Sequence, residues 1–94
     1  MPEKESEKLR YRMSEREAKE EVRRLTGVHY LEFAGKSKKR PLVTARSLYV
    51  YLRIEKGGAS QTAIMKELSV SDTHIYTMTR MGRMLCQANS QWFD

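Results

Sequence analysis

Two stretches of helical periodicity, separated by only three residues, restrict the fold of this 94-residue chain more than any other feature. The first, SQTAIMKEL (residues 60–68), begins with Ser60, a residue type that caps helix N-termini. The second, DTHIYTMTRMGRMLCQ (residues 72–87), is capped by Ser71 or Asp72. A turn of three residues makes the helices direct neighbours, so the pattern predicts a helix-turn-helix. Ile64 and Leu68 on the first helix are expected to pack against Ile75 and Met78 on the second, whose apolar stripe continues with Gly82 and Leu85.

The rest of the chain also reads as helical. Ser14 and Glu17 form a capping-box pattern for a helix that Gly27 ends. A short helix is expected within residues 28–35. A longer one begins at Pro41, which suits the first helical turn. The sequence therefore predicts an all-α domain, a small bundle of about five helices. The predicted core outside the helix-turn-helix is Val28, Leu31, Phe33, Leu42, Ala45, Leu48, Tyr49 and Leu52.

Length and composition limit the organisation to one domain. Residues 1–13 alternate charges with little apolar spacing and are expected to form a partly disordered arm before a single domain over residues 14–94. The charged N-terminus does not resemble a secretory signal, and no apolar run approaches the roughly 18 residues that span a bilayer. A cytoplasmic protein without membrane association is expected. Trp92 or Phe93 is expected to fold back onto the body.

The positive charge is concentrated in one part of the chain. Net charge is +6, yet residues 1–35 hold eight acids and eight bases, so the whole excess lies in residues 36–94. Within that part, KSKKR (residues 36–40) places four cations in five positions immediately before Pro41. Such asymmetry is typical of a surface that binds a polyanion, although a basic and otherwise unremarkable surface has the same composition.

The basic loop and the helix-turn-helix together predict binding to double-stranded DNA. The first turn of the second helix would enter the major groove, where hydroxyls, a carboxylate and an imidazole can meet base edges or phosphates. The loop would follow phosphates, with Arg40 entering the adjacent minor groove. Arg46 and Arg80 would contact flanking phosphates, as would Arg53, Lys66 and Arg83. The predicted DNA contacts are Lys36, Lys38, Lys39, Arg40, Arg46, Ser71, Asp72, Thr73, His74, Thr77 and Arg80.

Residues 36–75, KSKKRPLVTARSLYVYLRIEKGGASQTAIMKELSVSDTHI, resemble a known family. The order of basic loop, "AR" opening a long helix, turn and helix-turn-helix is similar to the C-terminal DNA-binding domain of the replication initiator DnaA. It is closer to the DnaA-like domain of REP-associated tyrosine transposases. The resemblance covers roughly residues 14–86 and implies a Trp-repressor-like fold, duplex recognition and minor-groove reading by Arg40.

The chain also departs from this family. The family's Asp-His-Thr at the start of the recognition helix falls on Ser71, Asp72 and Thr73, and only the threonine is kept. Relative to helix-turn-helix motifs in general, Met65 stands where the middle of the first helix usually has a small residue, and Ser69 stands where the turn usually has glycine. The resemblance therefore implies the docking mode rather than the initiator's target sequence. The initiator's nucleotide-binding motif and the transposase's catalytic His and Tyr motifs are absent.

Two other functions fit the same residues. A helix-turn-helix scaffold can serve as a protein-interaction module, with residues 1–26 docking a partner helix. An RNA or single-strand binder would stack bases on tyrosines, of which Tyr76 lies beside the proposed reading face. His29, His74 and Cys86 are too few and wrongly spaced for a metal site. No catalytic residue, cofactor or metal is expected, and a monomer, alone or linked to a catalytic domain or protein partner, is the expected form.

Overall fold

The computed structural model describes residues 12–89. Predictions about the arm before residue 12, and about Trp92 and Phe93, lie outside these residues. Arg12 and Met13, which the sequence assigned to the arm, are described, and Met13 packs against the core while its amide donates to the carbonyl of Lys56 at 3.1 Å.

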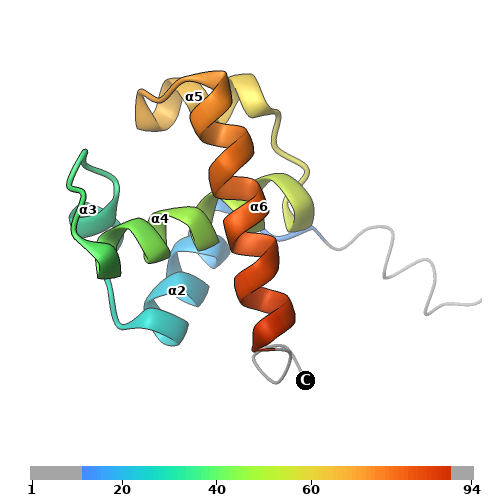
Figure 1. Ribbon diagram of the computed structural model, residues 1–94. Coiled ribbons are helices and arrows are strands. Elements are labelled where there is room, and N and C mark those ends of the chain that lie inside the picture. Colours follow the sequence, from blue (N-terminus) through green and yellow to red (C-terminus); the bar gives the residue numbers. More distant parts are fainter. Residues whose placement is uncertain (1–11, 90–94) are drawn as a thin grey trace, which may run out of the picture.

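The all-α prediction is confirmed, because the described residues form helices and contain no strand (Figure 1). The order along the chain is α2 (Glu15–Thr26), α3 (Tyr30–Phe33), α4 (Arg40–Tyr51), a π-helical turn η1 (Leu52–Lys56), α5 (Gln61–Leu68) and α6 (Asp72–Ala88).

The predicted end signals of α2 act as expected. Ser14 Oγ accepts from the Glu17 amide at 3.1 Å, and Glu17 Oε1 accepts from the Ser14 amide at 3.0 Å. At the other end Gly27 adopts a left-handed conformation with φ of 76°, which glycine reaches without a Cβ penalty.

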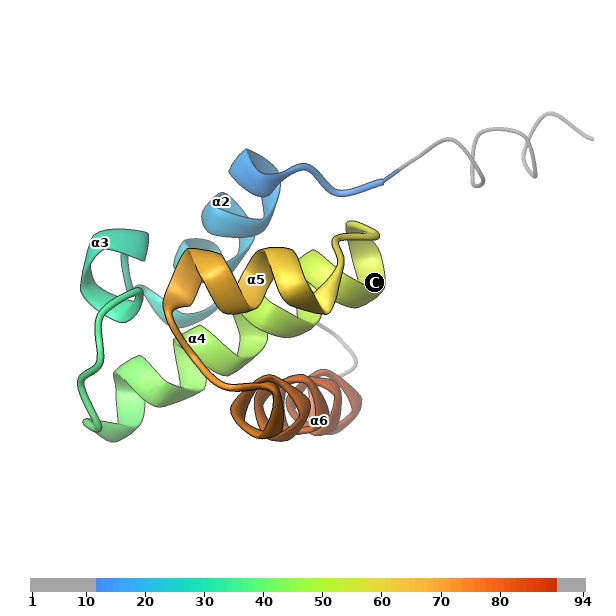
Figure 2. The ribbon, with the colours of Figure 1, turned by 90° about the horizontal axis from the view of Figure 1, so that it is seen from above.

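Helix α4 is the centre of the fold. It contacts α2, α3 and α6, with α2 and α6 on opposite sides of it (Figure 2). Ala45, Leu48, Tyr49 and Leu52 are fully buried as predicted, whereas Leu42 is half-buried. The helix begins at Arg40, one residue before Pro41, and continues into the π-helical turn instead of ending as a regular α-helix.

One predicted core residue is wrong. Leu31 is 89% exposed, whereas Phe33 is fully buried and Val28 is half-buried. Because α3 starts at Tyr30 and lasts a single turn, it faces Tyr30 and Phe33 inward at i and i+3 spacing. Their rings pack edge to face with centroids 5.3 Å apart, which leaves Leu31 pointing to solvent.

The predicted pairing of α5 and α6 is present. Ile64, Leu68, Ile75 and Met78 are all buried in one core cluster. On α6, Gly82 is also buried and lies against α4: a Cβ added there would come within 2.4 Å of Tyr51 Cβ and 2.5 Å of the Ser47 carbonyl oxygen. Glycine at this position therefore lets α6 cross α4 at close range. This contact sets where the exposed face of α6 lies.

Candidate nucleic-acid interface

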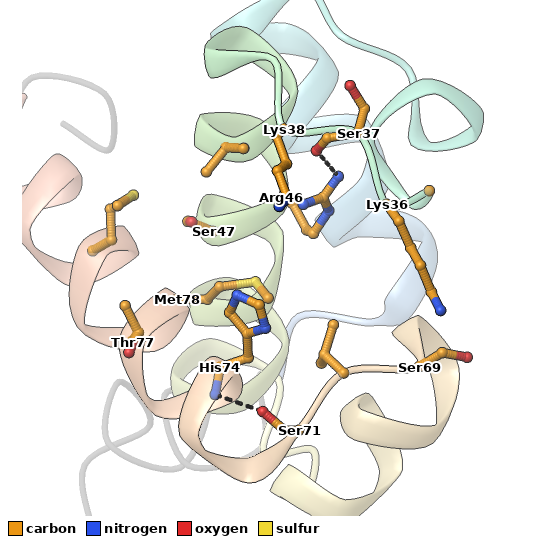
Figure 3. Close-up of a pocket in the computed structure, with 14 residues that line it drawn as sticks. Lys36, Ser37, Lys38, Arg46, Ser47, Ser69, Ser71, His74, Thr77 and Met78 are labelled. Carbon is orange, nitrogen blue, oxygen red and sulfur yellow. Dashed lines mark hydrogen bonds between the residues drawn. The ribbon is translucent and has the colours of Figure 1, made fainter.

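The basic loop and the start of α6 line the same hollow, although they are about thirty positions apart in sequence (Figure 3). The hollow has a volume of about 510 Å³. Its loop side is formed by residues 35–38 and its α6 side by residues 69–71, His74 and Thr77. Val43, Arg46, Ser47, Met78 and Met81 complete the lining, and no acidic residue belongs to it.

The turn before α6 is held by local backbone bonds. Ser69 ends α5 in a left-handed conformation, φ 55° and ψ 49°, and its amide donates to the carbonyl of Met65. The turn position where helix-turn-helix motifs usually have glycine thus keeps the backbone that glycine favours. Ser71 then caps α6, with its Oγ accepting from the His74 amide at 3.2 Å.

The first two turns of α6 present a polar row to solvent. Asp72, Thr73, His74 and Thr77 are all exposed. Thr77 Oγ1 donates to the Thr73 carbonyl at 3.0 Å, and Asp72 Oδ1 accepts from the Thr73 amide at 2.7 Å. The His74 imidazole makes no hydrogen bond within the described residues. The row therefore combines a free imidazole with hydroxyl oxygens that can still accept.

The loop is ordered around Ser37, whose Oγ accepts from the Lys39 amide at 3.2 Å. Lys36, Lys38, Lys39 and Arg40 are exposed. Within residues 12–89, none of the four forms an ion pair with a carboxylate. Lys39 is the N-cap of α4, and the first turn of that helix contains no acid. The N-terminus of α4 carries a partial positive charge, which repels the neighbouring cations. A bound anion would relieve this repulsion and would therefore be stabilised here.

Arg46 differs from its predicted role. It is only 8% exposed, because its guanidinium is turned inward: Nε donates to the Phe33 carbonyl at 2.7 Å and Nη2 donates to the Ser37 carbonyl at 2.9 Å. Burial lowers the pKa of this guanidinium. Arg46 thus fixes the loop onto α4, which makes it a positioning residue rather than an exposed phosphate contact.

Two of the other cations considered as phosphate contacts are already paired with carboxylates. Arg83 bonds to Glu55, and Arg53 lies between Glu67 at 3.3 Å and Glu15 at 3.8 Å. Arg80 and Lys66 remain exposed, and neither has an ion pair among the described residues.

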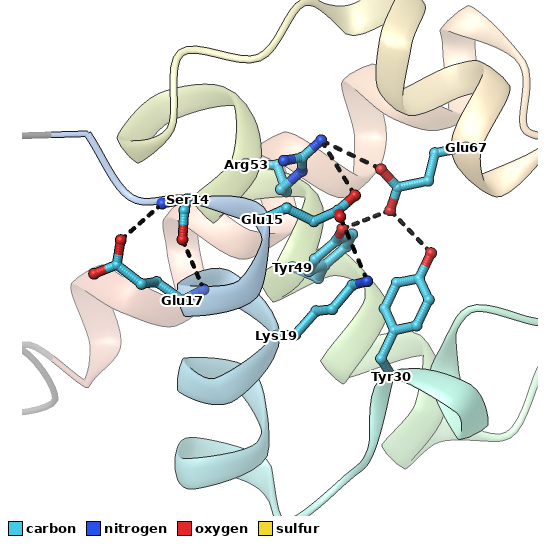
Figure 4. Close-up of polar contacts among 8 residues, drawn as sticks. All are labelled: Ser14, Glu15, Glu17, Lys19, Tyr30, Tyr49, Arg53 and Glu67. Carbon is cyan, nitrogen blue, oxygen red and sulfur yellow. Dashed lines mark hydrogen bonds and ion pairs between the residues drawn. The ribbon is translucent and has the colours of Figure 1, made fainter.

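A polar cluster holds α5 in place on a different face (Figure 4). Glu67 Oε2 accepts from the hydroxyls of Tyr30 at 2.9 Å and Tyr49 at 2.5 Å. Burial, and then the bond to Glu67, raises the pKa of Tyr30 to about 12, and the same causes raise the pKa of Tyr49. Tyr30 and Tyr49 are therefore structural and not free to stack on bases, whereas Tyr76 is 63% exposed.

Sequence reasoning missed this cluster and the apolar floor of the hollow. Tyr30 and Glu67 are 37 positions apart, and no periodicity connects them. Val43, Val70 and Met81 carry no signal that would place them around one cavity. The one usable signal was the helical register of Val43 relative to Ala45 and Leu48, which could have placed it at the edge of the buried face.

No family model, curated protein or solved structure matches this chain. Among residues 12–89, no group of three or more His, Cys, Asp or Glu side chains is placed to hold a metal ion. In the same part of the chain, no helix combines the length and apolar character needed to cross a membrane.

Proposed function

We propose that this protein binds double-stranded DNA with a sequence preference. The observation that carries the proposal is the shared hollow: the exposed and unpaired loop cations Lys36 and Lys38 line one side, and Ser71, His74 and Thr77 at the start of α6 line the other. The predicted contacts Lys39, Arg40, Asp72 and Thr73 are exposed but do not belong to its lining. The sequence alone did not predict that the loop and the start of α6 would line one hollow. A DNA duplex presents a groove flanked by phosphates, which matches a reading helix flanked by a cationic loop.

The loop supplies the part of the affinity that does not depend on sequence. Lys36, Lys38 and Lys39 neutralise phosphates and release counterions. Arg40, at the first position of α4, is fixed by Pro41 and by the helix itself, so its long side chain reaches the adjacent minor groove. Bound phosphates also relieve the repulsion between these cations and the α4 dipole.

Helix α6 supplies the sequence preference. Thr73 and Thr77 offer hydroxyls and methyl groups, Asp72 accepts from a cytosine amino group, and His74 reaches a base edge or phosphate. Arg80, one turn after Tyr76, contacts a phosphate beside the groove. This docking mode is the one that the DnaA-like resemblance implies, and it leads us to propose a chain that is part of, or related to, a transposase or a replication-initiator-like protein located with the nucleoid. No catalytic step is part of the proposal.

The test separates the two parts of the interface. A preferred duplex is first selected from a random pool and then bound by variants in fluorescence anisotropy. Lys38→Gln should weaken all duplexes alike and reduce the slope of log affinity against log salt by about 1. His74→Ala or Thr73→Ala should instead change the preferred sequence, at about 1–3 kcal/mol per lost base contact. Arg23→Gln removes the same charge from α2, which does not line the hollow, and serves as the control. Equal losses for Lys38→Gln and Arg23→Gln would contradict the proposal.

A protein partner is the second candidate, because α6 also carries an exposed apolar patch. Met81 is 39% exposed and Met84 is 61% exposed, and they border a second hollow with Leu85 and Ala88. A partner helix on this patch predicts that Met84→Ser abolishes binding of that partner and leaves duplex affinity unchanged. Failure of duplex binding would move the assignment to this surface.

A further inference from the structure

The floor of the hollow is apolar, and DNA binding does not use it. Val43, Val70, Met78 and Met81 line it between the loop and α6. Phosphates and base edges meet the polar rim, but they gain nothing from thioether and aliphatic surface below it. A concavity of about 510 Å³ with an apolar floor and a few polar groups has the size and character of a small-molecule site.

One buried polar group at this floor has no hydrogen-bond partner, and one buried charge there has no counter-charge among the described residues. Ser47 is fully buried, and its Oγ has no hydrogen-bond partner. Arg46, the neighbouring residue, is only 8% exposed. None of the described carboxylates forms an ion pair with its guanidinium. Its Nε and Nη2 donate only to neutral carbonyls, while Nη1 has no acceptor among residues 12–89. A buried cation compensated only by carbonyl dipoles is costly, and so is an unsatisfied buried hydroxyl.

We propose that the hollow binds a small amphipathic carboxylate. Its carboxylate would accept from the Arg46 guanidinium, and its apolar body would lie against Val43, Met78 and Met81. Lys36 and Lys38 at the rim add attraction for a negative charge. The ligand supplies both things that the hollow lacks: a counter-charge for the guanidinium and an apolar group that covers the floor.

A carboxylate with an apolar body fits this site better than a bare phosphate. Inorganic phosphate or a backbone phosphodiester would satisfy the cations but leave the floor in contact with water. The carboxylate ligand gains binding free energy from the cations and also from the apolar floor, because burial of apolar surface contributes in proportion to the area covered. Inorganic phosphate is therefore the natural competitor to include in the test.

The occupied site should oppose DNA binding. A negative charge at Lys36 and Lys38 cancels part of the attraction for phosphates, so ligand and duplex compete. This consequence rests on the proposed function, whereas binding of the ligand does not. The first experiment therefore contains no DNA.

The probe is 1-naphthaleneacetate, and 1-naphthaleneacetamide is the matched neutral compound. Each is titrated to about 5 mM against the full chain, with backbone amide chemical shifts recorded, so that dissociation constants up to the millimolar range are measurable. Saturable 1:1 binding is expected, with shifts centred on residues 35–38, 46–47 and 69–71. The acetate should bind about 10- to 100-fold more tightly than the amide, the factor that charge-assisted hydrogen bonds contribute.

Two variants locate the site. Val43→Phe reduces the space in the hollow and should weaken binding about tenfold or more. Val43 does not belong to the buried core cluster or to the side chains packed on it, so the fold should be retained, and dispersed amide spectra would verify this. Met84→Phe makes a comparable change on the neighbouring apolar patch and should leave the affinity unchanged.

Several results would overturn the proposal. One is that binding of the acetate does not saturate up to the highest concentration, and another is that acetate and amide bind with equal affinity. The others are that the chemical-shift changes centre on residues 80–88, or that inorganic phosphate binds as tightly as the acetate. None of them bears on duplex binding. A chain that binds the acetate and not DNA would support this site and refute the proposed function.

Discussion

Replacing Gly82 with alanine tests the crossing of α6 over α4. On an ordinary helix surface the change is favourable, because alanine has a higher helix propensity than glycine by about 1 kcal/mol. At Gly82 the added Cβ would lie 2.4 Å from Tyr51 Cβ and 2.5 Å from the Ser47 carbonyl oxygen. Non-bonded carbon atoms prefer about 3.5–4.0 Å, so the two helices must separate by roughly 1 Å.

The neighbours cannot avoid this overlap by a change of rotamer. Both contacts are to atoms fixed by the α4 backbone, and α4 is the buried centre of the fold. Forced insertion of one methyl into a packed interior costs about 1–3 kcal/mol, occasionally more. After the propensity gain, a net loss of up to about 2 kcal/mol in the free energy of unfolding is expected, which is a drop in Tm of roughly 4–8 °C per kcal/mol.

Urea unfolding followed by far-ultraviolet circular dichroism measures this change. Gly35→Ala is the matched control: no atom lies within 4 Å of its added Cβ, so its free energy of unfolding should stay within about 0.5 kcal/mol of the parent. If Gly82→Ala is more stable than the parent, then helix propensity dominates and the close crossing is refuted. The displaced α6 should also weaken duplex binding in the proposed interface, because the loop and the reading row no longer face one groove.

Three further changes have expected outcomes. Ser69→Gly should raise the free energy of unfolding by about 0.5–1 kcal/mol in urea denaturation, because a left-handed φ of 55° strains serine and suits glycine, although glycine's greater freedom in the unfolded chain offsets part of the gain. The free energy of unfolding should fall above about pH 10, because burial and Glu67 raise the pKa of Tyr30 to about 12. The stability that Tyr30 contributes is complete below the unfolded pKa of about 10 and is lost as pH rises through 12. Tyr49 acts in the same direction. Urea midpoints between pH 8 and 12 measure this loss, and Tyr30→Phe should reduce it; an unchanged profile in that variant would contradict the assignment. Leu31→Ser should change the free energy of unfolding by less than about 0.5 kcal/mol, because Leu31 is 89% exposed, and a larger loss would restore it to the core.

Local signals in the sequence were enough to predict the helices. The capping box of Ser14 and Glu17, the left-handed Gly27 and the N-caps Ser60 and Ser71 are all present, since each depends on residues within one turn of the chain. Leu31 was misassigned because a single helical turn has no periodicity from which to choose a face. The choice was made by the packing of Tyr30, Phe33 and Tyr49, which a short apolar stretch cannot reveal.

The candidate interface was predictable in its residue types but not in its geometry. Charge density indicated the loop, and the three-residue turn indicated the start of α6. Whether the two lie on one face depends on how α6 crosses α4, which follows from a close approach at Gly82 and not from any pattern. For Arg46, an exposed cation and a buried anchor have the same sequence signature, and only the positions of the Phe33 and Ser37 carbonyls distinguish them.

The most direct test of the central claim is the affinity for duplex and single-stranded DNA across a series of salt concentrations, measured by fluorescence anisotropy with a random-sequence pool. The account predicts micromolar duplex binding at low salt, preferred over the matched single strands, with log affinity falling linearly against log salt with a slope of about −3 or steeper, since at least three loop cations contact phosphates. No saturable duplex binding at low salt, or equal affinity for single strands, would contradict it.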